Sequence, residues 1–113
     1  MIEQTLSWQD FEKVDIRVGT ILEAEDFPGL RNPAYKLKID FGELGIKKSS
    51  AQITLLYNKE ELINKQILAV VNFPPKQIAN FMSECLVLGV LGQGKEVILL
   101  QPDKKAENGW KVG

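Results

Sequence analysis

The sequence predicts an all-β fold: a small barrel formed by one domain, residues 1–113. Residues 35–41 alternate between apolar and polar side chains, the pattern of a strand with one buried and one exposed face. Two further apolar runs, residues 67–71 and 86–88, are rich in β-branched side chains and are separated by a proline-containing connection. The chain has 113 residues, of which 44% are hydrophobic. This content suffices for one core and is too small for two.

The N-terminal segment predicts a short helix over about residues 7–13. Ser7 suits the N-cap position, because its side chain can accept a hydrogen bond from the backbone three residues later, where Asp10 stands. Trp8, Phe11 and Leu6 fall on one side of this helix. We expect this side to close the open end of the barrel; a dimer contact is the alternative.

The first three strands are expected between residues 14 and 52. The first strand is long, and Gly19 interrupts its alternation, so we expect a β-bulge or a sharp bend at Gly19. The second strand is the alternating run at residues 35–41, and the third is residues 46–52. A long, bent first strand is what a small closed barrel requires.

A helical link after the third strand leads to the fourth. Residues 53–63 have a weak helical pattern. The fourth strand begins at residue 67 and must end near Asn72, because Pro74 and Pro75 have no backbone N–H to donate to a ladder. The apolar run at residues 86–88 suits a further stretch of barrel wall.

The C-terminal part completes a five-stranded barrel. Residues 89–94 are expected to form a glycine-rich turn, and residues 97–100 the fifth barrel strand. Asn108 and Gly109 indicate a type I′ turn, so residues 101–113 are expected to form a hairpin extension. Five strands with a helical link after the third fit a Greek-key barrel of the OB type, whose strands 2 and 3 usually form the binding face. An SH3-like barrel is the main alternative.

The residue content argues against catalysis. The chain has no histidine and one cysteine, which removes Ser-His and Cys-His nucleophilic pairs and the usual His and Cys metal sites. The acidic residues cluster at the N-terminal helix and in turns, where solvent exposure explains them. We therefore expect no enzymatic activity, no metal and no cofactor. Cys85 stands in an apolar run, so a buried structural thiol is expected.

Charge is distributed unevenly around a net value of −1. Residues 1–26 contain two basic and seven acidic side chains, whereas residues 27–82 contain eight basic and four acidic ones. The middle of the chain can therefore attract a polyanion or an acidic peptide. No signal segment and no apolar run of membrane-spanning length is present, so we expect a cytoplasmic protein without an integral membrane segment.

Residues 89–96 resemble a phosphate-binding loop only superficially. They match the first seven positions of the pattern G-x-x-x-x-G-K-[ST], but Glu96 replaces the hydroxyl residue that would hold Mg²⁺. The residues that follow predict a strand, whereas a phosphate loop precedes a helix. We do not expect nucleotide binding here.

The connection between residues 72 and 83 mixes polar and apolar side chains and can line a binding groove. Phe73 and Phe81 are flanked by polar residues and are expected to be exposed. Tyr35 and Phe41 share the apolar alternation of the second strand and are expected to lie in the core. A surface loop without a binding role would have a similar composition, so both interpretations stay open on these residues alone.

Longer motifs resemble a known family. The segment F-E-K-V-D-I-R-V-G at residues 11–19 and N-F-P-P-K-Q-I at residues 72–78 resemble the two signatures of the tRNA-binding domain family. More narrowly, I-D-F-G at residues 39–42, S-S-A-Q-I-T at residues 49–54 and L-L-Q-P-D at residues 99–103 resemble the CsaA family of export-related chaperones. The resemblance implies an OB-fold homodimer that binds unfolded or precursor polypeptides and cooperates with the Sec translocation machinery. Related members bind tRNA.

Polypeptide binding is our first hypothesis, and structured-RNA or tRNA binding through the same face is the alternative. Phe81 and Met82 stand where tRNA binders often have glycine and a small residue, which favours the first hypothesis. We expect aromatic and aliphatic side chains to hold apolar segments, polar ones to bond the peptide backbone, and lysines to favour acidic flanks. The expected binding residues are Lys36, Lys47, Ser49, Gln52, Asn72, Phe73, Lys76, Ile78, Phe81 and Ser83.

Overall fold

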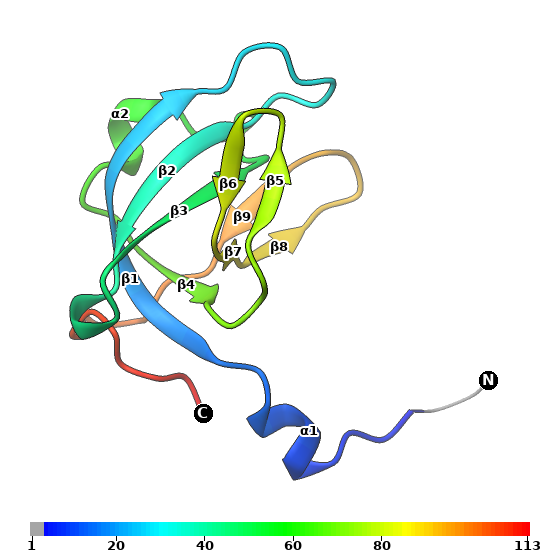
Figure 1. Ribbon diagram of the computed structural model, residues 1–113, viewed down its shortest axis with the longest axis vertical. Coiled ribbons are helices and arrows are strands. Elements are labelled where there is room, and N and C mark those ends of the chain that lie inside the picture. The colour runs from blue at the N-terminus through cyan, green and yellow to red at the C-terminus, as the bar shows by residue number, and fades with distance from the viewer. Residues whose placement is uncertain (1–3) are drawn as a thin grey trace.

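The computed structural model describes residues 4–113, which form a nearly closed five-stranded antiparallel barrel with a few short helices (Figure 1). The all-β prediction and the OB-type architecture are confirmed. The helices are α1 (Trp8–Glu12), the 3-10 helix η1 (Gly42–Leu44) and α2 (Lys59–Leu62). The strands are β1 (Ile16–Asp26), β2 (Tyr35–Asp40), β3 (Ile46–Ala51), β4 (Gln66–Val70), β5 (Lys76–Ile78), β6 (Phe81–Ser83), β7 (Leu86–Val87), β8 (Gly89–Leu91) and β9 (Val97–Leu99).

The barrel strands are ordered β3-β2-β1-β4-β7, and two hairpins, β5–β6 and β8–β9, stand beside them. β1 is long enough to change partners: its first half pairs with β4 and its second half with β2, with Thr20 paired to both. The expected bulge exists, but its position at Gly19 was wrong, because the register shifts between Ile21 and Glu23. Gly19 pairs regularly with Ile67.

The core lies inside this barrel. The inward side chains of β2 and the residue after it, Leu37, Ile39 and Phe41, are at most 1% exposed, as the alternation predicted. Gly19 faces two of them, and a Cβ built on it would lie 2.6 Å from both Ile39 and Phe41. The absence of a side chain at Gly19 therefore makes room for the core.

The barrel is incomplete between β3 and the segment that leads into β7. No strand pairing joins them within residues 4–113; instead, single hydrogen bonds span the gap. The Glu84 N–H donates to the Lys48 carbonyl (2.8 Å), and Glu84 Oε1 accepts from the Lys48 N–H (2.8 Å). Ser83 Oγ accepts from the Ser50 N–H at 3.2 Å. The β5–β6 hairpin lies within the proline-containing connection and begins this closing segment.

Helix α1 does not plug the barrel. Ser7 caps it as predicted, accepting from the Asp10 N–H at 3.0 Å. However, no residue of α1 is buried, and Trp8 and Leu6 are 79% and 70% exposed. The helix projects from the barrel at the N-terminal end of β1 (Figure 1). The expectation of a plug was wrong because five helical residues on an outward-directed segment cannot reach the barrel opening.

The C-terminal segment pairs with β1 rather than with itself. The Gly109 N–H donates to the Val18 carbonyl (2.7 Å), and the Val18 N–H donates to the Trp110 carbonyl (3.0 Å). Residues 101–107 contain no strand, so the expected hairpin extension was wrong. The turn at residues 107–110 has a positive φ only at Gly109 (92°), whereas a type I′ turn also requires one at Asn108.

The turn of the β5–β6 hairpin stores backbone strain at Ala79, whose φ is +53°. We predict that Ala79→Gly stabilises the protein by up to about 1 kcal/mol, since glycine adopts a positive φ without a Cβ penalty. Asn64→Gly is the matched control: Asn64 also has a positive φ (69°), but asparagine tolerates this region, so a smaller gain is expected. Urea unfolding of both variants measures the difference; equal gains would contradict the assignment of strain to Ala79.

Candidate functional site

A groove of about 700 Å³ opens where the barrel ladder is missing between β3 and β7. One wall is the end of β3 with Gln52 and Ile53, and another is the β5–β6 hairpin with the residues before it. The segment from Ser83 to Gly89 and the β8–β9 hairpin complete the lining. The groove therefore collects side chains from distant parts of the sequence.

Five of the ten expected binding residues line this groove: Gln52, Phe73, Lys76, Ile78 and Ser83. Phe73 is 55% exposed, as expected for an aromatic side chain available to a partner. The connection between residues 72 and 83 thus borders an accessible groove rather than facing inward.

The groove is apolar and nearly neutral. Its ionisable lining residues are Lys76, Glu84 and the thiol Cys85. Glu84 already accepts the Lys48 N–H through Oε1, so its carboxylate is partly occupied. A surface of this kind suits apolar side chains and uncharged backbone better than a highly charged polymer.

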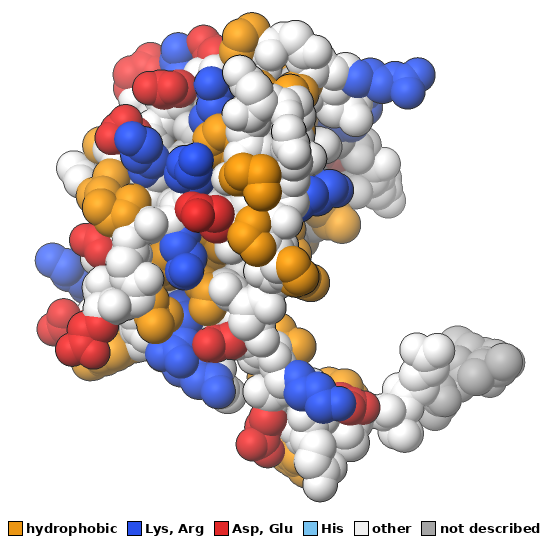
Figure 2. Space-filling model, in the orientation of Figure 1, with side chains coloured by type: hydrophobic (Ala, Val, Ile, Leu, Met, Phe, Trp, Pro, Cys, Tyr) orange, Lys and Arg blue, Asp and Glu red, His pale blue; other side chains and the backbone are white. Residues whose placement is uncertain are grey.

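Two other expected residues form a separate aromatic–lysine patch, defined by Phe27, Phe81, Lys36 and Lys48. The Phe81 ring meets Phe27 edge-on at 5.4 Å between centroids. Lys36 Nζ lies 5.2 Å from the Phe27 centroid, and Lys48 Nζ lies 5.3 Å from that of Phe81. Figure 2 shows basic side chains over β2 and β3 and hydrophobic ones over the β5–β6 hairpin.

The expected positions of Lys47 and Ser49 on the exposed face of β3 were wrong. Both residues belong to the opposite, inward face of the strand. Ser49 is fully buried, and its Oγ donates to the Cys85 carbonyl at 2.9 Å. Lys47 pairs with Ile39, which is also fully buried. Lys48, paired with Lys38, carries the outward charge instead. A shift of one residue exchanges the two faces of a strand, and the run of polar residues from Lys47 to Ser50 gave no apolar alternation to set it.

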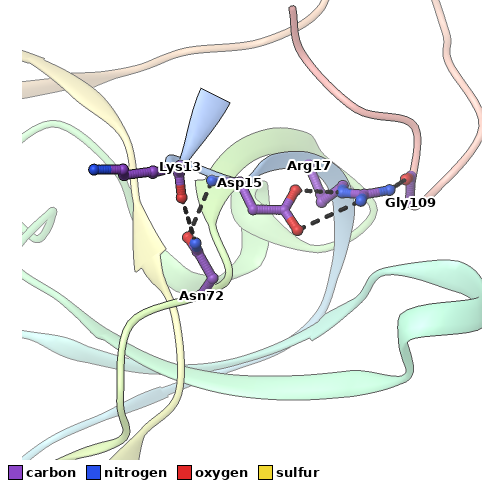
Figure 3. Close-up of polar contacts among 5 residues, drawn as sticks. All are labelled: Lys13, Asp15, Arg17, Asn72 and Gly109. Atoms are coloured by element: carbon purple, nitrogen blue, oxygen red, sulfur yellow. Dashed lines mark hydrogen bonds and ion pairs between the residues drawn. The ribbon is translucent and has the colours of Figure 1, made fainter. Parts of the chain in front are cut away.

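Asn72 does not line the groove. Its side chain lies between the backbone of Lys13 and that of Asp15 (Figure 3). Its Oδ1 accepts from the Asp15 N–H (3.0 Å), and its Nδ2 donates to the Lys13 carbonyl (2.6 Å). Arg17 continues this cluster, pairing with Asp15 (2.6 Å) and donating to the Gly109 carbonyl (2.9 Å). The cluster ties the junction of α1 and β1 to the end of β4 and to the C-terminal segment.

The main lining residues missed by the sequence analysis are Leu91 and Val97. Leu91 was missed because Gly89–Leu91, expected to be part of a turn, is strand β8. Val97 was missed because residues 97–100 were expected to form the fifth barrel strand, whereas within residues 4–113 β9 pairs only with β8 and the fifth barrel strand is β7. The apolar pair Val90 and Leu91 between the glycines was the available signal. The tight turn begins only at Gly92, where Glu96 accepts hydrogen bonds from Gly92 through its carbonyl (3.0 Å) and from Gly94 through Oε1 (2.6 Å).

A second hollow of about 700 Å³ is lined by Thr20, Asn64, Gln66 and residues 101–108. The Gln66 side chain bonds the backbone of Ala106 twice: its Nε2 donates to the Ala106 carbonyl (2.7 Å), and its Oε1 accepts from the Ala106 N–H (3.0 Å). These bonds fasten the C-terminal segment.

In residues 4–113, no group of three His, Cys, Asp or Glu side chains is placed to hold a metal ion. Within the same residues, no helix has the length and apolar content needed to span a bilayer.

Cys85 lies under the groove and is 6% exposed, as predicted for a structural thiol. Burial raises the pKa of the Cys85 thiol from 9.0 to about 11. The folded state thus holds the thiol proton more tightly than the unfolded state, so this contribution to stability is complete below pH 9 and is lost as the pH rises from 9 to about 11. The full loss is about 2 to 3 kcal/mol.

We predict that Cys85→Ala makes unfolding less dependent on pH in this window. The measurement is urea unfolding between pH 8 and about 11 for both proteins, with the difference in slope assigned to the thiol. Other groups that titrate there are common to both and cancel. Parallel curves would contradict a raised pKa at Cys85.

The fold and the groove define a binding module built on an OB barrel. Sequence comparison identifies the family of this module. The chain belongs to the family described as "Putative tRNA binding domain", whose model matches residues 16–111. The first signature segment, residues 11–19, falls largely on the Asp15–Arg17 cluster and on the core glycine Gly19. Its structural role here is to join α1, β1 and the C-terminal segment.

Within this family, the chain is similar over nearly its whole length to two solved CsaA chaperones. It is 53% identical to chaperone CsaA of Bacillus anthracis str. Ames, with a TM-score of 0.93, covering 97% of this chain and 100% of that one. It is 59% identical to the CsaA chaperone protein of Picrophilus torridus, with a TM-score of 0.90, covering 96% and 100%. The CsaA-like resemblance predicted from the sequence is confirmed.

The curated relatives include much longer proteins. Methionine–tRNA ligase of Pyrococcus furiosus is 35% identical over 109 residues, which are 96% of this chain and 15% of the ligase. The ligase of Nanoarchaeum equitans is 38% identical over 107 residues, 95% of this chain and 13% of the ligase. The chain therefore spans about a seventh of the length of these relatives.

Proposed function

We propose that this protein binds unfolded or precursor polypeptides in the groove between β3, the β5–β6 hairpin and β8, without catalysing a reaction. The observation that carries the proposal is the groove itself, an accessible and nearly neutral hollow with apolar walls and an exposed phenylalanine at its edge. The similarity to solved CsaA chaperones along nearly the whole chain supports it. Unfolded chains expose the apolar side chains that such a groove accepts.

Phe73→Ala tests the proposal. We expect the dissociation constant for a permanently unfolded protein, such as reduced and carboxymethylated lactalbumin, to rise by about tenfold, because a large apolar contact area is lost. Trp110→Ala is the matched control: Trp110 is 60% exposed but lies outside the groove. Fluorescence anisotropy with the labelled client measures both affinities. Equal affinities for wild type and Phe73→Ala would refute the groove as the binding site.

RNA binding is a second candidate, favoured by the aromatic–lysine patch. Phe81 offers a stacking surface beside two ammonium groups, and the family description supports a tRNA partner. We propose that tRNA, if bound, uses this patch rather than the groove. The net charge of −1 means that few phosphates are neutralised, so affinity would be modest.

The RNA alternative is tested by titrating tRNA at salt concentrations from about 50 to 200 mM, where phosphate contacts produce a steep loss of affinity. Lys36→Ala with Lys48→Ala should reduce the slope of log affinity against log salt by about 1 to 2. A competition at physiological salt between tRNA and unfolded polypeptide then separates the two surfaces: on this assignment neither displaces the other. A flat salt response would remove the RNA candidate.

The exposed N-terminal helix supports a homodimer. Trp8 in α1 and Leu6 just before it are 79% and 70% exposed, no residue of α1 is buried, and a second copy of the chain can bury both side chains. Trp8→Glu is expected to shift sedimentation from dimer to monomer.

We further propose a cytoplasmic location and cooperation with the Sec machinery. Cooperation with Sec is tested by co-purification of a secretory precursor with the wild-type protein and by its loss in Phe73→Ala.

A further inference from the structure

Strand β8 uses only one of its two edges. It pairs with β9 in a two-stranded sheet, and no other strand among residues 4–113 pairs with it. Hydrogen-bonded pairs alternate with non-hydrogen-bonded pairs along an antiparallel ladder. The Leu100 N–H donates to the Leu88 carbonyl at 3.3 Å, which places Gly89 and Leu91 at non-hydrogen-bonded positions. Their N–H and C=O groups therefore point away from β9.

The partner strand agrees with this alternation. Leu99 faces Gly89, and its N–H donates to Tyr57 Oη at 3.0 Å instead of to β8. Val90 faces Ile98 between the two free positions, so its backbone groups are directed toward β9.

The free edge of β8 borders the groove. Gly89 and Leu91 line it, whereas Val90 does not. Because Gly89 has no side chain, its backbone itself forms part of the wall. A Cβ at Gly89 would collide with the Val97 side chain, so the packing of the hairpin leaves no room for a side chain and Gly89 contributes only backbone to the wall.

The occupant of such an edge is an extended polypeptide. Its N–H and C=O groups recur on one side at every second residue, about 6.8 Å apart, which matches the spacing from Gly89 to Leu91 in β8. A nucleic acid has no such repeat and brings a negative charge with each phosphate. Lys76 is the one cationic side chain of the lining, so the groove offers little to neutralise that charge.

We propose that clients bind by strand addition: an extended client segment pairs with the free edge of β8 while its alternate side chains enter the apolar groove. This proposal rests on the polypeptide-binding function and specifies its mode. Main-chain hydrogen bonds then give affinity for any sequence, and the groove adds a preference for apolar residues at every second position.

Amide hydrogen exchange of the full chain tests the mode. The probe is a short synthetic peptide in which valine and threonine alternate. The amides of Gly89 and Leu91 are expected to exchange rapidly in the free protein and at least about tenfold more slowly when the peptide is saturating. Val90 is the internal control, because its N–H is bonded to β9 in both states. Unchanged exchange at Gly89 and Leu91 in the saturated complex would overturn strand addition.

Backbone methylation of the peptide provides a second, independent test. One peptide is N-methylated at its valines and the other at its threonines, so each loses the N–H groups on one side of the strand. We expect one of them to bind at least about tenfold more weakly than the unmethylated peptide and the other to bind within about twofold, since only one side faces β8. Equal effects of the two methylations would overturn the proposal.

The outcomes separate the mode from the function. Binding that depends on Phe73 but leaves the Gly89 and Leu91 amides unprotected refutes strand addition and leaves polypeptide binding standing. No binding of the peptide or of unfolded protein refutes the function as well. Protection of the same amides in the free protein that increases with protein concentration shows that a second copy occupies the edge, which also overturns the proposal.

Discussion

Gly19→Ala is expected to lower the free energy of unfolding by about 3 kcal/mol, one of the two largest effects predicted for this chain. The new Cβ would lie 2.6 Å from both Ile39 Cγ2 and Phe41 Cε1, and both of these side chains are fully buried. The backbone of Gly19 is held by its pairing with Ile67, so it cannot retreat without breaking the ladder between β1 and β4. Urea unfolding at neutral pH measures the change.

A rescue variant distinguishes overpacking from a loss of backbone flexibility. Phe41→Leu removes the ring that the new methyl group would meet, so the double variant Gly19→Ala with Phe41→Leu should be more stable than the sum of the single effects. Gly113→Ala is the matched control, because nothing lies within 4 Å of a Cβ at Gly113. Strict additivity of the two core changes would contradict a steric cause.

Leu91→Asp is expected to weaken binding of unfolded polypeptide by about 30-fold without a change in stability. Leu91 is 79% exposed in the free protein, so its replacement costs the fold little. In the complex, however, the carboxylate would be buried among apolar side chains without a partner, at a cost of about 2 kcal/mol. Anisotropy with labelled unfolded lactalbumin and urea unfolding measure the two quantities.

Val90→Asp is the control for this substitution. Val90 precedes Leu91 on the same strand and is 51% exposed, but it does not line the groove. It introduces the same charge on the opposite face of β8, so its affinity should match that of the wild type. Equal losses for the two variants would indicate a general effect of charge and would remove Leu91 from the binding surface.

The fold could be predicted where hydrophobic alternation was strong. The run at residues 35–41 gave the correct inward side chains, and the glycine and proline positions bounded the strands to within a few residues. The prediction failed where alternation was weak. In β3, Lys47, Lys48, Ser49 and Ser50 are all polar, so the sequence did not reveal which of the two lysines faces outward. Only pairing with β2 decides this.

The candidate site was predicted in part for the same reason. The connection at residues 72–83 was expected to border a groove, and Phe73, Lys76 and Ile78 line one. Phe81 and Lys36 belong to a different surface, and Asn72 holds the α1–β1 junction. The opposite wall was missed because it comes from β8, whose glycines indicate a turn when read locally.

By itself, the amino-acid sequence determined the all-β class, the capped N-terminal helix, the buried face of β2 and the burial of Cys85, because each depends on residue type and short-range periodicity. Only the tertiary structure decided that a groove exists and which residues share it. The groove opens because β3 and β7, thirty-five residues apart from the end of one to the start of the other, approach without completing a ladder. The local sequence of β3 or of β7 does not indicate that the ladder between them is missing, because pairing between distant strands depends on the tertiary fold.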